Sequence, residues 1–285
     1  MRSKLLRSIY YVTKDNFVTI PQTLSDELAK HGIKIYQVPL ASIDRFLPPK
    51  NATITSCLIL SDVPELVQAF LDNGYYVVAV HNFNNKGASF PHVPFAVEDF
   101  TEIDWHYFIR FWQRYAGIPW HILSTERCKV REMCPEDLNG IYDLYSDKRI
   151  CQYTEDLFEN RIQELNYIKD YVSNAYGYYG YGTWLIEDAF TGKLIGRAGF
   201  NHRPGFDDPE IGFVIKPTYW RHGLAYEVCQ AILKYGKEEH GFSRTHAFVR
   251  IENEASIKLL EKLGFRACGR YTINDIMHER YVLEY

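Results

Sequence analysis

The segment from residue 210 to residue 239 constrains the fold of this chain more than any other. Residues 210–215 read EIGFVI, an apolar strand, and Gly223 stands between this strand and a helix expected at 226–239. Apolar residues at 225, 228, 229, 232 and 233 follow the period of a helix that packs on a sheet. Free N–H groups and the dipole at the start of such a helix favour an anion, and glycine lets the main chain approach it closely. The segment therefore suits a pyrophosphate site, and a glycine before a helix is also typical of a plain tight turn.

A second helix start lies downstream of this segment. NEAS at 253–256 opens a helix that closes with LEKLGF at 260–265. With PEIGFVI at 209–215 and WRHGLA at 220–225, these words resemble the GNAT acetyltransferase superfamily in order and spacing, over about residues 126–285. The resemblance is strongest to its ribosomal-protein-alanine and spermidine acetyltransferase-like branch. It implies the GNAT fold, a mixed and mostly antiparallel sheet flanked by helices, with acetyl-CoA as the cofactor and coenzyme A as a product.

The resemblance also assigns contacts to the cofactor. The pantetheine arm and the thioester carbonyl would meet the main chain of Phe213, Val214 and Ile215. The pyrophosphate would be surrounded by Arg221, His222, Gly223, Leu224 and Ala225, with a charge-assisted contact from Arg221. Asn253 and Ser256 would hydrogen-bond the cofactor arm, although both residue types also suit capping of the helix that they begin.

The chemistry implied is direct attack of a primary amine on the thioester, through a tetrahedral intermediate. Because the amine must lose a proton, we expect Glu210 to act as the base, and Asp207 and Asp208 are the nearest substitutes. Glu210 also fits a solvated strand end. At position 260, where many relatives carry a tyrosine general acid, this chain has leucine, so solvent or another tyrosine such as Tyr271 must protonate the thiolate. Trp220 is a second departure, because it replaces the first residue of the family's R/Q-x-x-G-x-G/A turn.

Tyrosines are concentrated between residues 167 and 181, where relatives form the acceptor pocket. Aromatic walls with hydroxyl groups suit an amine carried on an apolar or cationic ligand. We expect the acceptor to meet Tyr178, Tyr179 and His202. Tyr167 and Tyr171 fit equally as core residues of a helix. The acceptor stays open among a protein N-terminus, a lysine, a polyamine and another small amine.

Residues 1–122 alternate strands and helices, an order that predicts a small α/β domain with a mainly parallel sheet. The order is weakly similar to Rossmann-like and haloacid-dehalogenase-like units. It lacks the D-x-D nucleophile pair of the latter, because LSDV at 60–63 holds a single aspartate. We expect Asp62 to cap the next helix, with Glu65 completing a capping box. Strands are expected at 33–38, 54–60 and 75–80, and helices at 63–73 and 104–115.

The stretch GIPW at 117–120 marks a boundary that we place after residue 122, so that residues 123–285 form the GNAT domain. Its strands are expected at 128–133, 183–187, 194–201, 210–215, 245–249, 266–272 and 277–284, and its helices at 135–146, 159–175, 226–239 and 255–262.

Composition excludes several classes of protein. The net charge of −4 gives no support to a nucleic-acid partner, and no apolar run is long enough to span a membrane. Six cysteines without a C-x-x-C pair, and no signal peptide, indicate reduced thiols in a cytoplasmic protein. The His and Asp spacing around residue 207 fits no metal site. The sequence thus predicts a cytoplasmic, two-domain N-acetyltransferase that binds no metal; the alternative is a non-catalytic acyl-CoA sensor.

Overall fold

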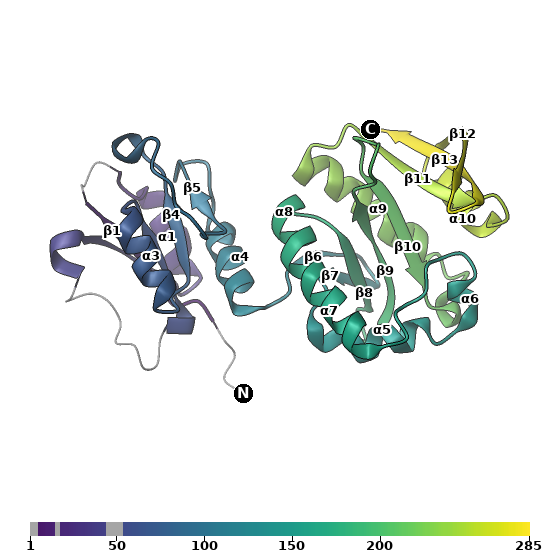
Figure 1. The fold of residues 1–285 in the computed structure, drawn as a ribbon, viewed down its shortest axis with the longest axis horizontal. Coiled ribbons are helices and arrows are strands. Elements are labelled where there is room, and N and C mark those ends of the chain that lie inside the picture. The colour runs from purple at the N-terminus through teal and green to yellow at the C-terminus, as the bar shows by residue number, and fades with distance from the viewer. Residues whose placement is uncertain (1–4, 15–17, 44–53) are drawn as a thin grey trace. The chain divides into compact units, whose positions relative to one another are not determined.

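The computed structural model describes residues 5–14, 18–43 and 54–285 (Figure 1). The chain divides into two compact units, Met1–Ile118 and Pro119–Tyr285. The division lies a few residues before the expected boundary because strand β6 (His121–Ser124) pairs with β7 (Cys128–Arg131) and so belongs to the second sheet.

The first unit is built on a parallel sheet with strand order β2-β1-β3-β4-β5. This confirms the predicted small α/β domain. Its strands are β1 (Ser8–Thr13), β2 (Lys34–Pro39), β3 (Cys57–Ser61), β4 (Val77–Val80) and β5 (Ala96–Val97). Its helices are α1 (Gln22–Lys30), α3 (Pro64–Asp72) and α4 (Trp105–Ala116). All five residues of β3 are buried, as expected for a strand covered on both faces.

The predicted cap at Asp62 is wrong. Helix α3 begins at Pro64 after Val63, and in the described part of the chain no side chain caps it. Proline at the first helical position carries no N–H that needs a cap. The Asp62 carboxylate instead accepts hydrogen bonds from Thr13 Oγ1 at 2.8 Å, Asn82 Nδ2 at 2.9 Å and the N–H of Lys14 at 3.2 Å. It ties together the loops at the carboxyl ends of β1, β3 and β4.

The second unit is built on an eight-stranded sheet with order β12-β13-β11-β10-β9-β8-β7-β6. Neighbouring strands are antiparallel except β10 and β11, which confirms the predicted mixed sheet. The remaining strands are β8 (Thr183–Asp188), β9 (Leu194–Asn201), β10 (Glu210–Ile215), β11 (Arg244–Arg250), β12 (Arg266–Ile273) and β13 (Ile276–Glu284). Its helices are α5 (Leu138–Tyr145), α6 (Lys148–Cys151), α7 (Arg161–Tyr171), α8 (Gly177–Tyr179), α9 (Leu224–His240) and α10 (Glu254–Lys262).

The helix expected at 159–175 is longer than predicted. After α7 the chain continues through a π-helical turn, Val172–Tyr176, into α8, and only Gly180, with φ +72°, ends it. The tyrosine-rich stretch is therefore largely helical.

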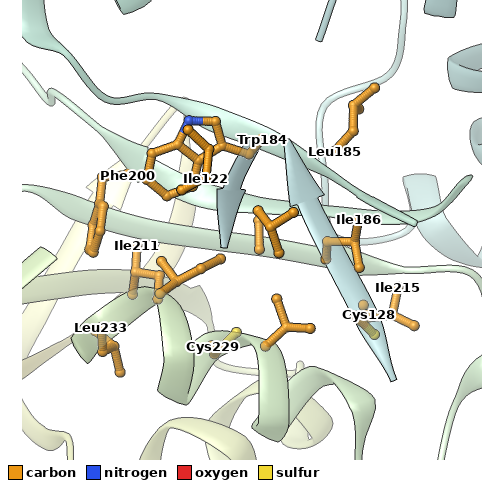
Figure 2. Packing of buried hydrophobic residues seen from close by; sticks show 14 of the residues in the cluster. Ile122, Cys128, Trp184, Leu185, Ile186, Phe200, Ile211, Ile215, Cys229 and Leu233 are labelled. Carbon is orange, nitrogen blue, oxygen red and sulfur yellow. The ribbon is translucent and has the colours of Figure 1, made fainter. Parts of the chain in front are cut away.

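Helices cover both faces of the second sheet. On one face Trp184 packs edge-on against Tyr235 of α9, with ring centroids 5.6 Å apart. Figure 2 shows Ile211 and Ile215 of β10 on the same side as Leu233 of α9. On the other face, β9 side chains contact helices α5 and α7 through their tyrosines. We call these the α9 face and the α5/α7 face.

Candidate functional site

Strands β10 and β11 run parallel but separate almost at once. Glu210 pairs with His246, whose N–H donates to the carbonyl of Pro209 at 3.0 Å. No further residue pair joins these two strands, all of whose residues are described. Main-chain groups alternate in direction along a strand, so the N–H and C=O of Phe213 point to the same side as the carbonyl of Pro209. They lie in the gap that opens between the two strands.

The three predicted strand residues do not present their main chains alike. Val214 pairs with Arg197 in the antiparallel ladder to β9, so its main chain faces away from the gap. Ile215 faces the gap with Phe213, but its carbonyl accepts a hydrogen bond from Trp220 Nε1 at 2.6 Å. That bond explains the departure at position 220, because the indole ties the end of β10 to the turn that follows.

The turn at 221–223 has the shape of an anion site. Arg221 has φ +64° and Gly223 has φ +77°, and both residues are exposed, as is His222 between them. Left-handed residues that alternate with right-handed ones turn successive N–H groups inward. The 17-residue helix α9 begins next, with the side chain of Leu224 buried against the core, so that its dipole points into the turn. The turn is positioned by the packing of the helix.

An arginine that the sequence analysis missed braces this turn. Arg127 donates from Nη1 to the carbonyl of His222 at 2.9 Å and from Nε to Glu227 Oε2 at 2.7 Å. The N–H of Arg127 donates to Glu227 Oε1 at 3.0 Å. Glu227 lies in the first turn of α9, where a free carboxylate would repel phosphate. Arg127 neutralises it, but the two residues are 100 positions apart and no local pattern links them.

Asn253 caps helix α10, as the alternative interpretation held. Its Oδ1 accepts the N–H of Ser256 at 3.2 Å. This bond uses the side-chain oxygen of Asn253. The side-chain NH₂ group of Asn253 is the part that could donate a hydrogen bond to a cofactor. The predicted pair therefore lies together at one helix start, with Asn253 holding Ser256 in place.

Glu210, the predicted base, is held by an arginine. Arg203 forms a two-pronged ion pair with its carboxylate, from Nε to Oε2 and from Nη2 to Oε1 at 3.1 Å. The Glu210 side chain is 14% exposed. Arg203 lies in the connection between β9 and β10, and Glu210 begins β10, so the separation of only seven residues was a signal that could have found Arg203. A proton from an amine would have to reach a carboxylate that is already paired with a cation.

Aromatic rings surround this ion pair. The Arg203 guanidinium lies 4.9 Å from the ring centroid of Phe248, which is 5.3 Å from both His246 and Tyr271. His246 is fully buried, and burial together with nearby Arg280 lowers its pKa to about 4. The imidazole is thus neutral at neutral pH. Tyr271 is 37% exposed, whereas Leu260 is a buried core residue, so of these two positions only Tyr271 presents a side chain to solvent.

The predicted acceptor residues are only partly brought together. Tyr179 stacks on His202, with ring centroids 5.6 Å apart and planes 20° apart. Tyr178 contacts Tyr179 edge-on but is 84% exposed. Tyr171 is a structural residue, because its hydroxyl accepts the N–H of Thr183 at 2.7 Å and donates to Asn201 Oδ1 at 3.2 Å.

The GNAT resemblance noted in the sequence can be compared with known protein families and relatives. The sequence model of the GNAT acetyltransferase domain matches residues 127–266. An uncharacterised N-acetyltransferase of Bacillus subtilis strain 168 is 34% identical over 154 residues, which cover 52% of this chain and 84% of that protein. The chain belongs to the GNAT acetyltransferase family. Its second unit is the GNAT domain.

More distant relatives have more specific names. The spermidine N(1)-acetyltransferase of Escherichia coli K12 is 24% identical, over 56% of this chain and 81% of that enzyme. A ribosomal L7/L12 alpha-N-protein acetyltransferase solved with coenzyme A shares the fold, with a TM-score of 0.50 and 14% identity over 58% of this chain and 98% of that one. The acetyltransferase of Agrobacterium tumefaciens C58 has a TM-score of 0.50 and 21% identity, over 57% and 94%.

The described residues contain neither a candidate metal cluster nor a candidate membrane span. In residues 5–14, 18–43 and 54–285, no three His, Cys, Asp or Glu side chains are grouped so that they could hold a metal ion. Across the same ranges, no helix combines the length and the apolar character needed to cross a membrane.

Proposed function

We propose that the GNAT domain transfers the acetyl group of acetyl-CoA to a primary amine. The observation that carries this proposal is the gap between β10 and β11, which leaves the main chain of Phe213 unpaired beside the turn at 221–223. An extended arm fits the gap and a pyrophosphate fits the turn, so both ends of one ligand would be bound mainly by main-chain groups.

The acetyl donor supplies an activated thioester carbonyl. The N–H of Phe213 would donate to its oxygen, where negative charge develops as the amine nitrogen attacks. The attack forms the N–C bond of a tetrahedral intermediate. Its collapse breaks the C–S bond, and coenzyme A leaves as a thiolate that is then protonated to the thiol. The nitrogen releases its proton, which Glu210 would receive through water. Tyr271 is exposed, and its ring contacts Phe248, over which Arg203 lies; it is our candidate to protonate the sulfur.

The division of labour is part of this proposal. We propose that residues 123–285 bind the cofactor and that residues 1–122 have a separate role. Arg221, His222, Gly223, Leu224 and Ala225 would hold the pyrophosphate, and Asn253 with Ser256 would contact the arm. Tyr178, Tyr179 and His202 would meet the acceptor.

The test measures thiol release from acetyl-CoA with a panel of amines, alongside calorimetric titration of acetyl-CoA. An acetyltransferase binds acetyl-CoA and releases thiol only when an amine is present, and mass spectrometry finds the acetylated amine. Binding without thiol release from any amine would support the non-catalytic sensor instead. Failure to bind acetyl-CoA at all would refute both.

A further inference from the structure

The α5/α7 face of the GNAT domain holds an arginine with no carboxylate partner. Arg197 of β9 is half-buried, and its Nε is enclosed without a hydrogen-bond partner. Its Nη1 makes one long hydrogen bond, to the hydroxyl of Tyr145 at 3.4 Å. Among the described residues, no carboxylate lies within 4.0 Å of its guanidinium. Enclosed charges in proteins are normally paired with an opposite charge. The Arg197 guanidinium lacks such an anionic partner.

The groups around Arg197 do not supply a negative charge. Its guanidinium lies 5.8 Å from the ring centroid of Tyr145, and Tyr167 and Tyr176 lie close enough to interact with it. Burial raises the pKa of Tyr167 and of Tyr176 above the ordinary value, so both hydroxyls are neutral at neutral pH. By contrast, Arg131 on the same sheet binds Asp137 at 2.7 Å through two nitrogens.

Arg197 lies beside the place where the thioester is proposed to bind. It pairs directly with Val214, the residue between Phe213 and Ile215, and directly opposed residues in an antiparallel ladder share a face. The next pair along the same face is Gly199 with Gly212. A Cβ built on Gly212 would meet only Asn201 Nδ2, at 3.6 Å. The face is therefore open at Gly212 of β10, on the side opposite α9, whereas at Gly199 of β9 a Cβ would clash with the carbonyl oxygen of Gly182.

We propose that Arg197 binds a carboxylate of the acceptor, so that the acceptor is a small amine that also carries a carboxylate, such as an amino acid. This inference rests on the proposed function and narrows its substrate class. A guanidinium can donate two parallel hydrogen bonds to a carboxylate, and Arg197 uses its terminal nitrogens for only the one long bond from Nη1. The same cation disfavours a polyamine, because two positive charges would be enclosed together. The resemblance to a spermidine acetyltransferase therefore does not extend to its substrate.

The experiment compares each common amino acid with its own carboxamide, which keeps the amine and the side chain but removes the negative charge. We expect kcat/KM for the best amino acid to exceed that of its amide by about 100-fold, the usual effect of removing one partner of an enclosed charge pair. Spermidine should give no thiol release above background. Equal rates for the amino acids and their amides, or a preference for spermidine, would overturn the inference and leave acetyl transfer standing. No thiol release from any amine would overturn both.

Variants separate recognition from a purely structural role. Arg197→Gln should reduce the ratio of acid to amide to about 1, while acetyl-CoA affinity by calorimetry stays unchanged. Arg197→Lys keeps the charge and should keep part of the preference. Tyr145→Phe removes only the long hydrogen bond and should leave the ratio unchanged. A structural arginine would change the melting temperature in Arg197→Gln but not the ratio, and if that variant fails to fold, the wild-type ratio still decides.

Discussion

Both units of this protein place polar groups where two parallel strands end or separate. Only one unit leaves those groups without hydrogen-bond partners from the chain itself. In the first unit, parallel strands β3 and β4 stay paired through three registered residues, Ile59 to Ser61. Asp62 follows them, and its carboxylate is filled by Thr13, Asn82 and Lys14. In the GNAT domain, the parallel strands β10 and β11 share one registered pair, Glu210 with His246, and then diverge.

The difference shows what distinguishes a group that can bind a ligand from a group that only holds loops together. A carboxylate at the end of parallel strands is the usual sign of a ligand site. Asp62 has such a position, but residues of its own unit already donate hydrogen bonds to its carboxylate. The main chain of Phe213 belongs to no recognisable side-chain motif, yet it faces the gap between β10 and β11. Unfilled hydrogen-bonding capacity, rather than residue type, marks the site in this molecule.

Replacing Gly223 by Asp should have the largest effect on the open region. The change places a carboxylate where phosphate is proposed to bind, and acetyl-CoA affinity measured by calorimetry should fall by about 100-fold or more. A Cβ there meets only Arg127 Nη2, at 3.8 Å, so the fold has room for it. Gly241→Asp is the matched control, because Gly241 has φ +65° at the other end of the same helix. Equal losses in the two variants would point to backbone strain instead.

Glu210→Gln tests whether Glu210, at the point where β10 and β11 separate, is the base that accepts the amine proton. Acetyl-CoA affinity should stay the same while kcat falls by about 100-fold, the low end for a lost acid–base group. The deficit should shrink as pH rises, because more of the acceptor amine is then already deprotonated. Asp207→Asn, at an exposed neighbour, should leave kcat unchanged.

Arg203→Gln sharpens the same test. If Glu210 receives the proton, releasing it from the ion pair should cost less activity than removing it. If Arg203→Gln lowers kcat as much as Glu210→Gln, the pair serves to position β10 and the base lies elsewhere.

Asp62→Asn tests the closed region. It replaces a carboxylate that accepts four hydrogen bonds, from Tyr11, Thr13, Lys14 and Asn82, and the free energy of unfolding in urea should fall by about 2 kcal/mol. Acetyl-CoA affinity and kcat should not change. Asp72→Asn, on the exposed end of α3, is the control and should leave stability almost unaffected. Lost turnover in a folded Asp62→Asn protein would show that the first unit takes part in catalysis.

Arg127→Gln should have a smaller effect on acetyl-CoA affinity, because Arg127 supports the turn at 221–223 and is not proposed to contact the ligand. Acetyl-CoA affinity should fall by about tenfold, which corresponds to about 1.4 kcal/mol. Glu227→Gln combined with Arg127→Gln should lose less than the sum of the two single changes, because the residues form one ion pair. Additive losses in that double-mutant cycle would contradict the bracing role.

The smallest effect is expected on separating the two units. A fragment of residues 119–285 contains the whole second sheet and its own core, so it should fold and bind acetyl-CoA with the affinity of the full chain. Circular dichroism checks the fold and calorimetry the affinity. A folded fragment that binds no acetyl-CoA would show that the first unit contributes to the cofactor site.

Much of the fold could be predicted from local sequence. Apolar periods of two and 3.6 residues located the strands and helices around residues 183–265, because burial against a sheet dictates those periods. The words at 209–215, 220–225, 253–256 and 260–265 resemble those of the GNAT superfamily, and each lies in a short strand, a turn or a helix end whose geometry is local. Strand β1 and helix α1 were missed, because the polar residues around them mask the pattern.

The chemistry of the site was decided by contacts between distant residues. The sequence contains Asp62 before a helix, and only the folded sheet brings Thr13 and Asn82 to its carboxylate. Glu210 is a plausible base in the sequence, and the hairpin then places Arg203 on it. Arg127 contacts the turn at 221–223 although 100 residues separate it from its partner Glu227, and Arg197 is conspicuous only because the fold encloses its Nε without an acid. Sequence determines which groups a chain possesses, but whether a hydrogen-bonding group is filled or free depends on every element packed around it.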